Sequence, residues 1–383
     1  MLVFFASRFT SLNSDCDGNE ICNQVGCPGG LPELDRGLEL VMGIEMKKVA
    51  LLATALAMVT TGSAFAADLH VKALKAPPPP AFDPWDIAFG GGIMNDYIFR
   101  GVTQSNHKPS VAAYFEPRYN VTKDLQLYVG VSGESISFTN RAAAEIDIYG
   151  GIRPTFGAFA FDIGVWGYLY PGGTCYYGAA ADTAGKPLSA ECAANFLPNG
   201  NVMKRDVSFF EVYGKVNYTI NDNWQFGLNE YYSPDFLHSG AWGNYTSITG
   251  KYTAPSTVFG SSGVGLYVSG EFGRQWLGTS DSFYGTGFTN PGFAGPFPNG
   301  IKYADYNTWN IGVGFTYKVF TLDLRYSDTN LSKGDCNAFT SAFNGSGTNN
   351  VTAINPTGVG SNWCGAAGIA KLSADLTAMT NLK

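Results

Sequence analysis

Charged residues are scarce in this chain. Asp, Glu, Lys and Arg make up only 14% of the 383 residues, and the formal net charge is -7. In a soluble domain, roughly a quarter of the residues are charged, so this chain has too little charge for a large water-facing surface. The lack of a basic excess argues against a nucleic-acid partner. The hydrophobic content of 45% argues against a disordered chain.

Long hydrophobic runs and histidines are also few. Beyond residue 66, no run of 18 or more apolar residues occurs, so the sequence predicts no helical membrane span there. The 48 glycines disfavour long helices, because glycine weakens a helix wherever it lies inside one.

The three histidines are His70, His107 and His238. No residue pattern predicts a catalytic residue, a bound metal or a cofactor.

Residues 46–66 are typical of a secretion signal. A positively charged start at 46–48 and an apolar stretch at 49–61 are followed by small residues that end at Ala66. The apolar stretch is shorter than the ~20 residues of a membrane-spanning helix. We expect signal cleavage between Ala66 and Ala67.

The segments around this signal differ from the rest of the chain. A signal peptide acts at an N-terminus, so we expect residues 1–45 to be an upstream extension that is not part of the mature protein. Residues 67–85 are expected to form a proline-rich periplasmic linker. Pro77–Pro80 make it extended and semi-rigid, and they exclude a central strand.

Four cysteines follow the signal, and they form two local pairs. An even number of cysteines in an exported chain is typical of disulfides formed in an oxidising compartment. We therefore expect the disulfides Cys175–Cys192 and Cys336–Cys364, each of which would bracket one long loop. The alternative is two pairs of unlinked thiols.

From residue 86 onward, apolar and polar side chains alternate with a period of two. Such alternation predicts strands with one apolar and one polar face. It is clearest over residues 159–165, 224–229, 264–272, 309–317 and 320–327. About twelve strands are predicted, near residues 86–100, 109–121, 124–138, 143–157, 158–171, 202–220, 223–234, 243–256, 263–277, 303–318, 319–330 and 366–379.

The connections between these strands alternate in length. Those after odd-numbered strands include the long stretches 172–201, 278–302 and 331–365, whereas those after even-numbered strands are mostly tight turns. Residues 86–383 are therefore predicted to form an all-β, antiparallel, up-and-down transmembrane β-barrel with short periplasmic turns and long extracellular loops. The aromatic residues are expected mainly at lipid-facing and interfacial positions. A soluble β-sandwich is the alternative, but its outer faces would need more charge.

Residues 95–105, with the sequence Asn-Asp-Tyr-Ile-Phe-Arg-Gly-Val-Thr-Gln-Ser, carry a family resemblance. They resemble the opening of the TorF family of proteobacterial porins, in which the first strand ends in a similar D-Y-x-F-R-G-x-[ST]-Q run. The resemblance implies an outer-membrane barrel and no catalytic residue. In strand geometry, Asp96 and Arg100 are expected on the lumen face, and Tyr97 and Phe99 on the lipid face.

The same alternation places many charged residues inside the barrel, because Lys or Arg on the lipid face would cost ~2 to 4 kcal/mol at the midplane. The acidic residues predicted to face the lumen outnumber the basic ones, which motivates a hypothesis of weak cation preference. The lumen-facing set is Asp96, Arg100, Glu116, Arg118, Glu134, Asp147, Arg153, Asp162, Glu211, Lys215, Glu271, Asp323, Arg325, Lys371 and Asp375.

Three functions are compatible with such a barrel. The favoured one is a porin-like channel for passive diffusion of small hydrophilic solutes or ions, with outer-membrane lipid as its other partner. A structural or adhesive barrel that acts through its extracellular loops is the second. A lipid-active enzyme is the third and would depend on His107 or His238, but both are predicted in loops and not on a lipid-facing strand.

Overall fold

The computed structural model describes residues 83–175, 203–285 and 295–382. The chain divides into a unit of residues 1–78, which lies outside these ranges, and a unit of residues 79–383. The predicted upstream extension, the signal peptide, its cleavage site and residues 67–82 of the linker therefore lie outside the described residues.

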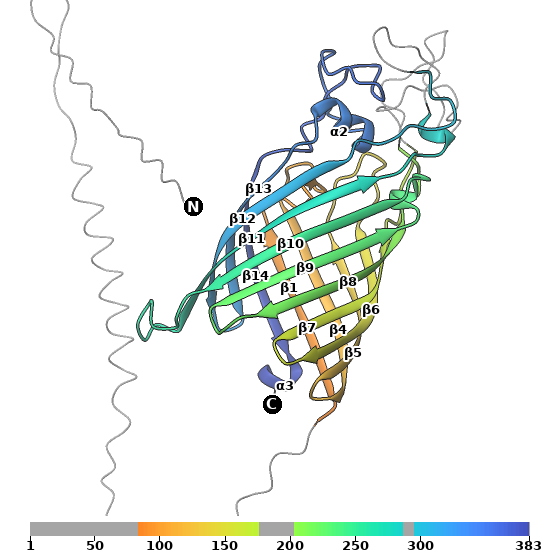
Figure 1. The fold of residues 1–383 in the computed structure, drawn as a ribbon. Coiled ribbons are helices and arrows are strands. Elements are labelled where there is room, and N and C mark those ends of the chain that lie inside the picture. The colour runs from red at the N-terminus through yellow and green to blue at the C-terminus, as the bar shows by residue number, and fades with distance from the viewer. Residues whose placement is uncertain (1–82, 176–202, 286–294, 383) are drawn as a thin grey trace, which may run out of the picture. The chain divides into compact units, whose positions relative to one another are not determined.

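Twelve antiparallel strands close into one barrel, in the order β1-β14-β13-β12-β11-β10-β9-β8-β7-β6-β5-β4 (Figure 1). This confirms the predicted fold class. The last strand closes the barrel by pairing with the first, from Ala88 opposite Thr377 to Met94 opposite Lys371. The barrel strands are β1 (Trp85–Met94), β4 (Ser110–Thr122), β5 (Leu125–Glu134), β6 (Glu145–Phe156), β7 (Phe159–Leu169), β8 (Phe209–Thr219), β9 (Trp224–Ser233), β10 (Gly243–Thr253), β11 (Val264–Leu277), β12 (Tyr306–Tyr317), β13 (Phe320–Thr329) and β14 (Ala367–Thr377).

The two ends of the barrel differ, as the connection lengths predict. The tight turns lie at one end, together with the start of β1 and the short helix α3 (Ala378–Asn381), and we term this the turn end. The long connections lie at the other, the loop end. They carry the helix α2 (Lys333–Thr340) and two 3-10 turns, η2 (Phe236–His238) and η3 (Ser282–Tyr284). None of the helices in the described ranges is long and apolar enough to cross a membrane.

The outer surface of the barrel is apolar on every strand. Side chains alternate in exposure with the pleat, so that in β5 Tyr128 is 4% exposed and its neighbour Val129 is 61% exposed. The exposed apolar side chains include Ile93, Val111, Phe115, Val129, Val131, Ile148, Ile152, Ile163, Val165, Phe210, Val212, Phe226, Leu228, Ile248, Val268, Phe272, Ile311, Leu322, Leu324 and Leu372.

Aromatic side chains gather on the outside near the turn end. Trp85 contacts Tyr119, and Phe159 stacks on Tyr218, with ring centroids 4.8 Å apart in both pairs. Trp224, from the next strand pair, is exposed at the same level. Such a girdle suits the interface between hydrocarbon and headgroups, where an aromatic ring has an apolar body and a polarisable edge.

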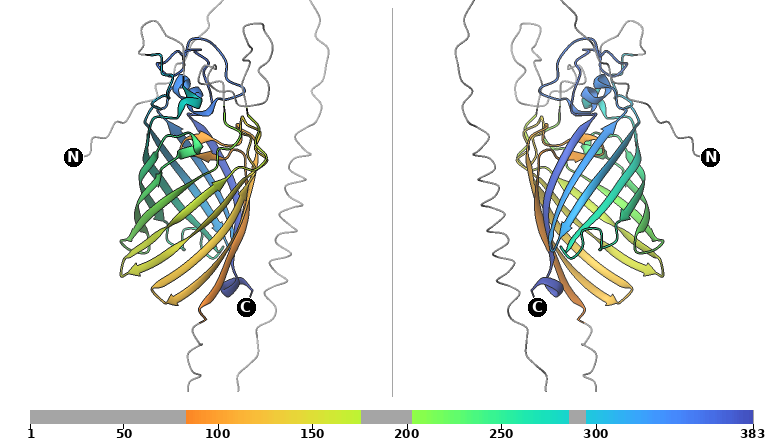
Figure 2. Two further views of the ribbon diagram at one scale, coloured as in Figure 1. Left: turned by 90° about the vertical axis from the view of Figure 1, so that its right-hand side faces the viewer. Right: turned by 90° about the vertical axis from the view of Figure 1, so that its left-hand side faces the viewer.

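The first strand is shorter than the sequence predicts. β1 ends at Met94, and the chain then turns inward and forms a small hairpin of β2 (Ile98–Phe99) and β3 (Val102–Thr103). We term residues 95–105 the lumen hairpin. Side chains of β7 to β13 surround it, so it lies inside the barrel near the loop end (Figure 2). The prediction that Tyr97 and Phe99 face lipid is therefore wrong.

The loop end is covered by residues 330–366, which we term the cap. Ser332 caps the N-terminus of α2 by accepting a hydrogen bond from the main-chain NH of Asp335. An apolar core joins the cap to the upper barrel wall and includes Val102, Phe236, Tyr306 and Trp363. The cap thus packs onto the upper barrel wall at the loop end.

Candidate functional site

The lumen hairpin reverses direction at Arg100 and Gly101. Both residues have positive φ, 48° and 78°, as a two-residue type I′ turn requires. A Cβ atom at Gly101 would overlap the side chains of Thr308 and Thr329, so the tip of the turn fits closely against β12 and β13. Glycine is needed here both for its conformation and for its small size.

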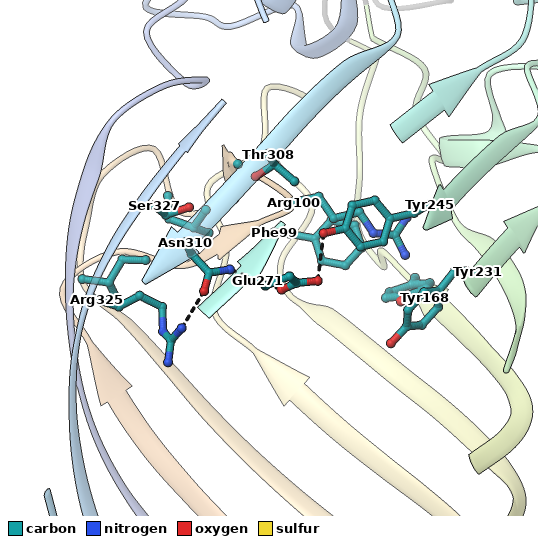
Figure 3. A pocket seen from close by; sticks show the side chains of 13 residues that line it. Phe99, Arg100, Tyr168, Tyr231, Tyr245, Glu271, Thr308, Asn310, Arg325 and Ser327 are labelled. Atoms are coloured by element: carbon teal, nitrogen blue, oxygen red, sulfur yellow. Dashed lines mark hydrogen bonds between the residues drawn. The ribbon is translucent and has the colours of Figure 1, made fainter. Parts of the chain in front are cut away.

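Arg100 is the main anchor of this hairpin. Its guanidinium donates two hydrogen bonds of 2.8 Å to the two carboxylate oxygens of Glu211, and one of 3.1 Å to Gln275. The side chains of Arg100 and Glu211 are 5% and 1% exposed. The aromatic rings of Tyr245 and Tyr231 lie 4.4 and 4.9 Å from the guanidinium (Figure 3). Burial disfavours the charge, but the Glu211 carboxylate outweighs it and raises the pKa of Arg100 above its usual value.

Asp96 organises the base of the hairpin. Its carboxylate accepts hydrogen bonds from the hydroxyls of Thr103 and Ser105, at 2.5 and 3.0 Å, and contacts His107 Nδ1 at 2.7 Å. His107 Nε2 lies 2.8 Å from the main-chain oxygen of Asn362 in the cap. Asp96 and Arg100 therefore lie on an inserted turn, with separate partners, and not on the inner face of the first strand. The prediction that they share that strand face is wrong.

The cap is fastened to the hairpin. The predicted disulfide Cys336–Cys364 is confirmed, with Cα atoms 6.0 Å apart. Cys364 forms an isolated β-bridge with Val102, and the main-chain NH of Thr103 donates to the oxygen of Trp363 at 2.8 Å. A disulfide of this loop length contributes roughly 3 to 4 kcal/mol in the loop-entropy account. The other predicted pair, Cys175–Cys192, includes a residue outside the described ranges.

Further along the lumen, opposite charges of β4, β6 and β7 meet. Arg153 donates to Glu116 at 2.8 Å and to Asp162 at 3.3 Å, and Arg118 donates to the same Glu116 at 2.6 Å. These contacts link β4, β6 and β7. They neutralise part of the charge that the sequence places in the barrel.

The other lumen charges lie on β8, β13 and β14. Arg325 contacts Asp323 at 3.0 Å and donates to the side-chain oxygen of Asn310 at 2.5 Å (Figure 3). Lys215 faces aromatic rings, with its ammonium 4.5 Å from the centroid of Tyr213. Lys371 and Asp375 lie on β14, where Asp375 accepts a hydrogen bond from a tyrosine hydroxyl.

Many lumen positions are tyrosines, which the sequence-based expectation for aromatic residues missed. Their hydroxyls donate to lumen carboxylates, as Tyr245 does to Glu271 at 2.9 Å and Tyr267 to Asp323 at 2.7 Å. A phenol thus joins the polar inner surface through its hydroxyl while its ring fills space beside a lumen glycine. The signal was available for Tyr267, which lies between the apolar residues Leu266 and Val268.

Two pockets lie beside the hairpin. One, of about 260 Å³, is lined by Phe99, Arg100, Tyr245, Glu271 and Arg325, among others (Figure 3). The other, of about 520 Å³, is lined by residues of the wall formed by β4 to β9. Phe99, Tyr168 and Tyr231 line both pockets, so the hairpin and two tyrosines separate them.

Three carboxylates meet in the wall near the larger pocket. Glu134 of β5 and Glu145 and Asp147 of β6 each offer an oxygen, and these oxygens lie within 4.8 Å of one another. The sequence analysis found Glu134 and Asp147 but missed Glu145. Glu145 has the same strand parity as Asp147, and this parity was the signal that could have found it.

Residues 80–185 match a family described as a bacterial protein of unknown function (Gcw_chp). No curated protein matches this chain.

Several solved outer-membrane barrels are similar at low identity. An outer-membrane channel from Pseudomonas putida F1 is 10% identical, with 81% of this chain and 100% of that chain covered and a TM-score of 0.36. The porin NanC is 6% identical, with coverages of 75% and 97% and a TM-score of 0.34. LpxR from Salmonella typhimurium is 8% identical, with coverages of 76% and 99% and a TM-score of 0.33.

Proposed function

We propose that this protein is an outer-membrane channel for passive diffusion of small hydrophilic solutes or ions, which the lumen hairpin and the cap hold in a closed state. The observation that carries this proposal is a polar, charged lumen that contains pockets of about 260 and 520 Å³ beside the lumen hairpin. An eight-stranded barrel is filled by side chains and one of sixteen to eighteen strands leaves a wide channel, so a twelve-stranded barrel has room for a narrow path.

The membrane location is supported by the apolar outer surface and its aromatic girdle. Val129→Arg places a charge in the middle of β5 on the exposed face, and we expect it to lower the free energy of unfolding by ~2 to 4 kcal/mol in lipid. Ser261→Arg, in the exposed turn between β10 and β11, is the matched control and should have little effect. Urea unfolding in lipid vesicles measures both. Equal effects of the two variants would refute the lipid contact of Val129.

The selectivity of the channel follows from its uncompensated lumen charge. Arg153 and Arg325 are paired with acids. Among the described residues, the lumen acids without an ion pair outnumber the lumen lysines without one: the acids are Glu134, Glu145, Asp147, Glu271 and Asp375, and the lysines are Lys215, Lys251 and Lys371. We therefore expect cation preference. Reversal potentials in a planar bilayer under a KCl gradient measure it once removal of the lumen hairpin has opened the mouth, and clear anion preference would overturn the proposal.

An adhesive or structural barrel predicts a different outcome in the same bilayer, namely silence even after the mouth is opened. A catalytic role for His107 has less support. A hydroxyl nucleophile needs a histidine nitrogen within hydrogen-bond reach, but Nδ1 faces Asp96 and Nε2 faces a main-chain oxygen. Both contacts position the cap on the hairpin.

A further inference from the structure

The three-carboxylate cluster is unusual because like charges oppose each other directly in the sheet. Glu134 of β5 is the cross-strand partner of Glu145 of β6, and Asp147 lies opposite Ser132. Like charges at directly opposite positions destabilise a sheet. The inner wall thus concentrates negative charge at one place near the loop end.

Two oxygens of this cluster lack a hydrogen-bond partner. Asp147 is 4% exposed, and its Oδ1 atom is buried with no hydrogen-bond partner among the described residues. Oε2 of the half-buried Glu134 also lacks a partner there, as does the indole Nε1 of Trp166, which interacts with the Asp147 carboxyl group. A buried carboxylate without compensation is strongly unfavourable, so either a proton or a cation must neutralise it. The unpartnered oxygens point to a ligand that accepts their lone pairs.

The other oxygens are held in place by hydroxyl donors. Ser132 donates to Asp147 Oδ2 at 2.9 Å. Glu145 accepts from the hydroxyls of Tyr97 and Tyr170, at 2.7 and 3.1 Å. Such donors orient carboxylates for a metal while leaving a lone pair of each oxygen available.

We propose that Glu134, Glu145 and Asp147 form a binding site for a calcium-like divalent cation. Calcium takes oxygen ligands at about 2.3 to 2.6 Å, so two ligands on opposite sides of it lie at most about 5 Å apart. The oxygens of this cluster, all within 4.8 Å of one another, satisfy that limit. The pocket of about 520 Å³, which Glu134 and Asp147 line, leaves room for water ligands and for access.

The site goes beyond the proposed channel function, and it contacts the lumen hairpin that is proposed to hold the channel closed. Tyr97 belongs to the lumen hairpin, and its hydroxyl contacts Glu145 directly. A bound cation removes the repulsion among the three carboxylates and thereby holds Glu145 where Tyr97 meets it. Cation binding therefore stabilises the docked hairpin.

Terbium luminescence tests the site without any measurement of transport. Trp166 lines the same pocket and can sensitise a Tb³⁺ ion bound at the cluster. We expect the purified protein in detergent at neutral pH to give a saturable Tb³⁺ signal on tryptophan excitation, which CaCl₂ reverses. The double variant Glu134→Gln, Asp147→Asn should bind at least about tenfold more weakly, because affinity follows the number of charged ligands.

A matched control and a folding measurement keep the result interpretable. Glu230→Gln removes a carboxylate that is exposed elsewhere on the barrel, and it should leave the signal unchanged. A heat-modifiable gel shift shows that each variant is folded. The proposal is overturned by a folded protein with no saturable signal, which would mean that protons neutralise the cluster, or by an equal signal in the double variant. Neither outcome depends on conductance, so a failure of the proposed cation site can be distinguished from a failure of the proposed channel function.

Discussion

Glu211→Gln is expected to lower the free energy of unfolding by about 3 to 5 kcal/mol. The substitution keeps the shape of the side chain but removes the charge that compensates Arg100. Both side chains are almost completely buried, and their two hydrogen bonds of 2.8 Å are bidentate. The guanidinium would then stay buried against aromatic rings without its anion. Urea unfolding in lipid vesicles, followed by tryptophan fluorescence, measures the change.

Two further variants separate charge from packing. Arg100→Met together with Glu211→Met removes both charges and keeps extended side chains, so it should recover most of the lost stability, because a buried pair replaced by apolar groups is often neutral. Asp222→Asn, in the exposed turn between β8 and β9, should change stability by less than about 1 kcal/mol. If Glu211→Gln were no more destabilising than Asp222→Asn, the ion pair would not anchor the hairpin.

The barrel itself follows from local signals in the sequence. Alternation of apolar and polar residues is a property of each strand alone, and the predicted segment 264–272 lies within β11 for that reason. The lengths of the connections then distinguish the turn end from the loop end. Both signals can be read from the sequence without knowledge of contacts between distant residues.

The lumen hairpin could not be predicted in this way. Residues 95–100 continue the alternation of β1, but alternation does not tell whether a residue meets lipid or the inside of the barrel. The turn depends on positive φ at Arg100, a residue type that does not signal a type I′ turn, and on an anion supplied by Glu211 more than a hundred residues later. The fold of this segment is therefore decided by tertiary contacts.

The carboxylate cluster shows a second limit. Strand parity places Glu134 and Asp147 inside the barrel, but their closeness depends on the register between β5 and β6. That register is influenced by the loop 135–144, whose length and hydrogen bonds no periodicity encodes. Sequence patterns thus predict the face of the strand on which a residue lies. To predict the site, one must also know which residue lies opposite it on the neighbouring strand.

Removal of the lumen hairpin is expected to open the channel. Met94 and Ser110 are direct cross-strand partners, so residues 96–108 can be replaced by a Gly-Ser pair that joins β1 to β4 without strain on the barrel. Asn95 is kept because its side chain contacts β14. The replacement removes Phe99 from the wall shared by the two pockets. It also removes the contacts that the hairpin makes with the cap. Single-channel conductance in a planar bilayer should rise several-fold and become continuous.

The control for this replacement is a deletion at the opposite end of the barrel. Shortening the exposed turn 255–262, between β10 and β11, changes the chain length without touching the mouth, and it should leave conductance as in the wild type. Glu211 loses Arg100 in the open variant, but water entering the lumen can solvate its carboxylate, so the barrel should still fold and show a heat-modifiable gel shift. A folded open variant with wild-type conductance would show that the hairpin is not the gate. Silence of both proteins would favour a barrel that acts through its loops, because the path would then be blocked by the polar contacts of the lower lumen, such as those of Arg153 and Arg325.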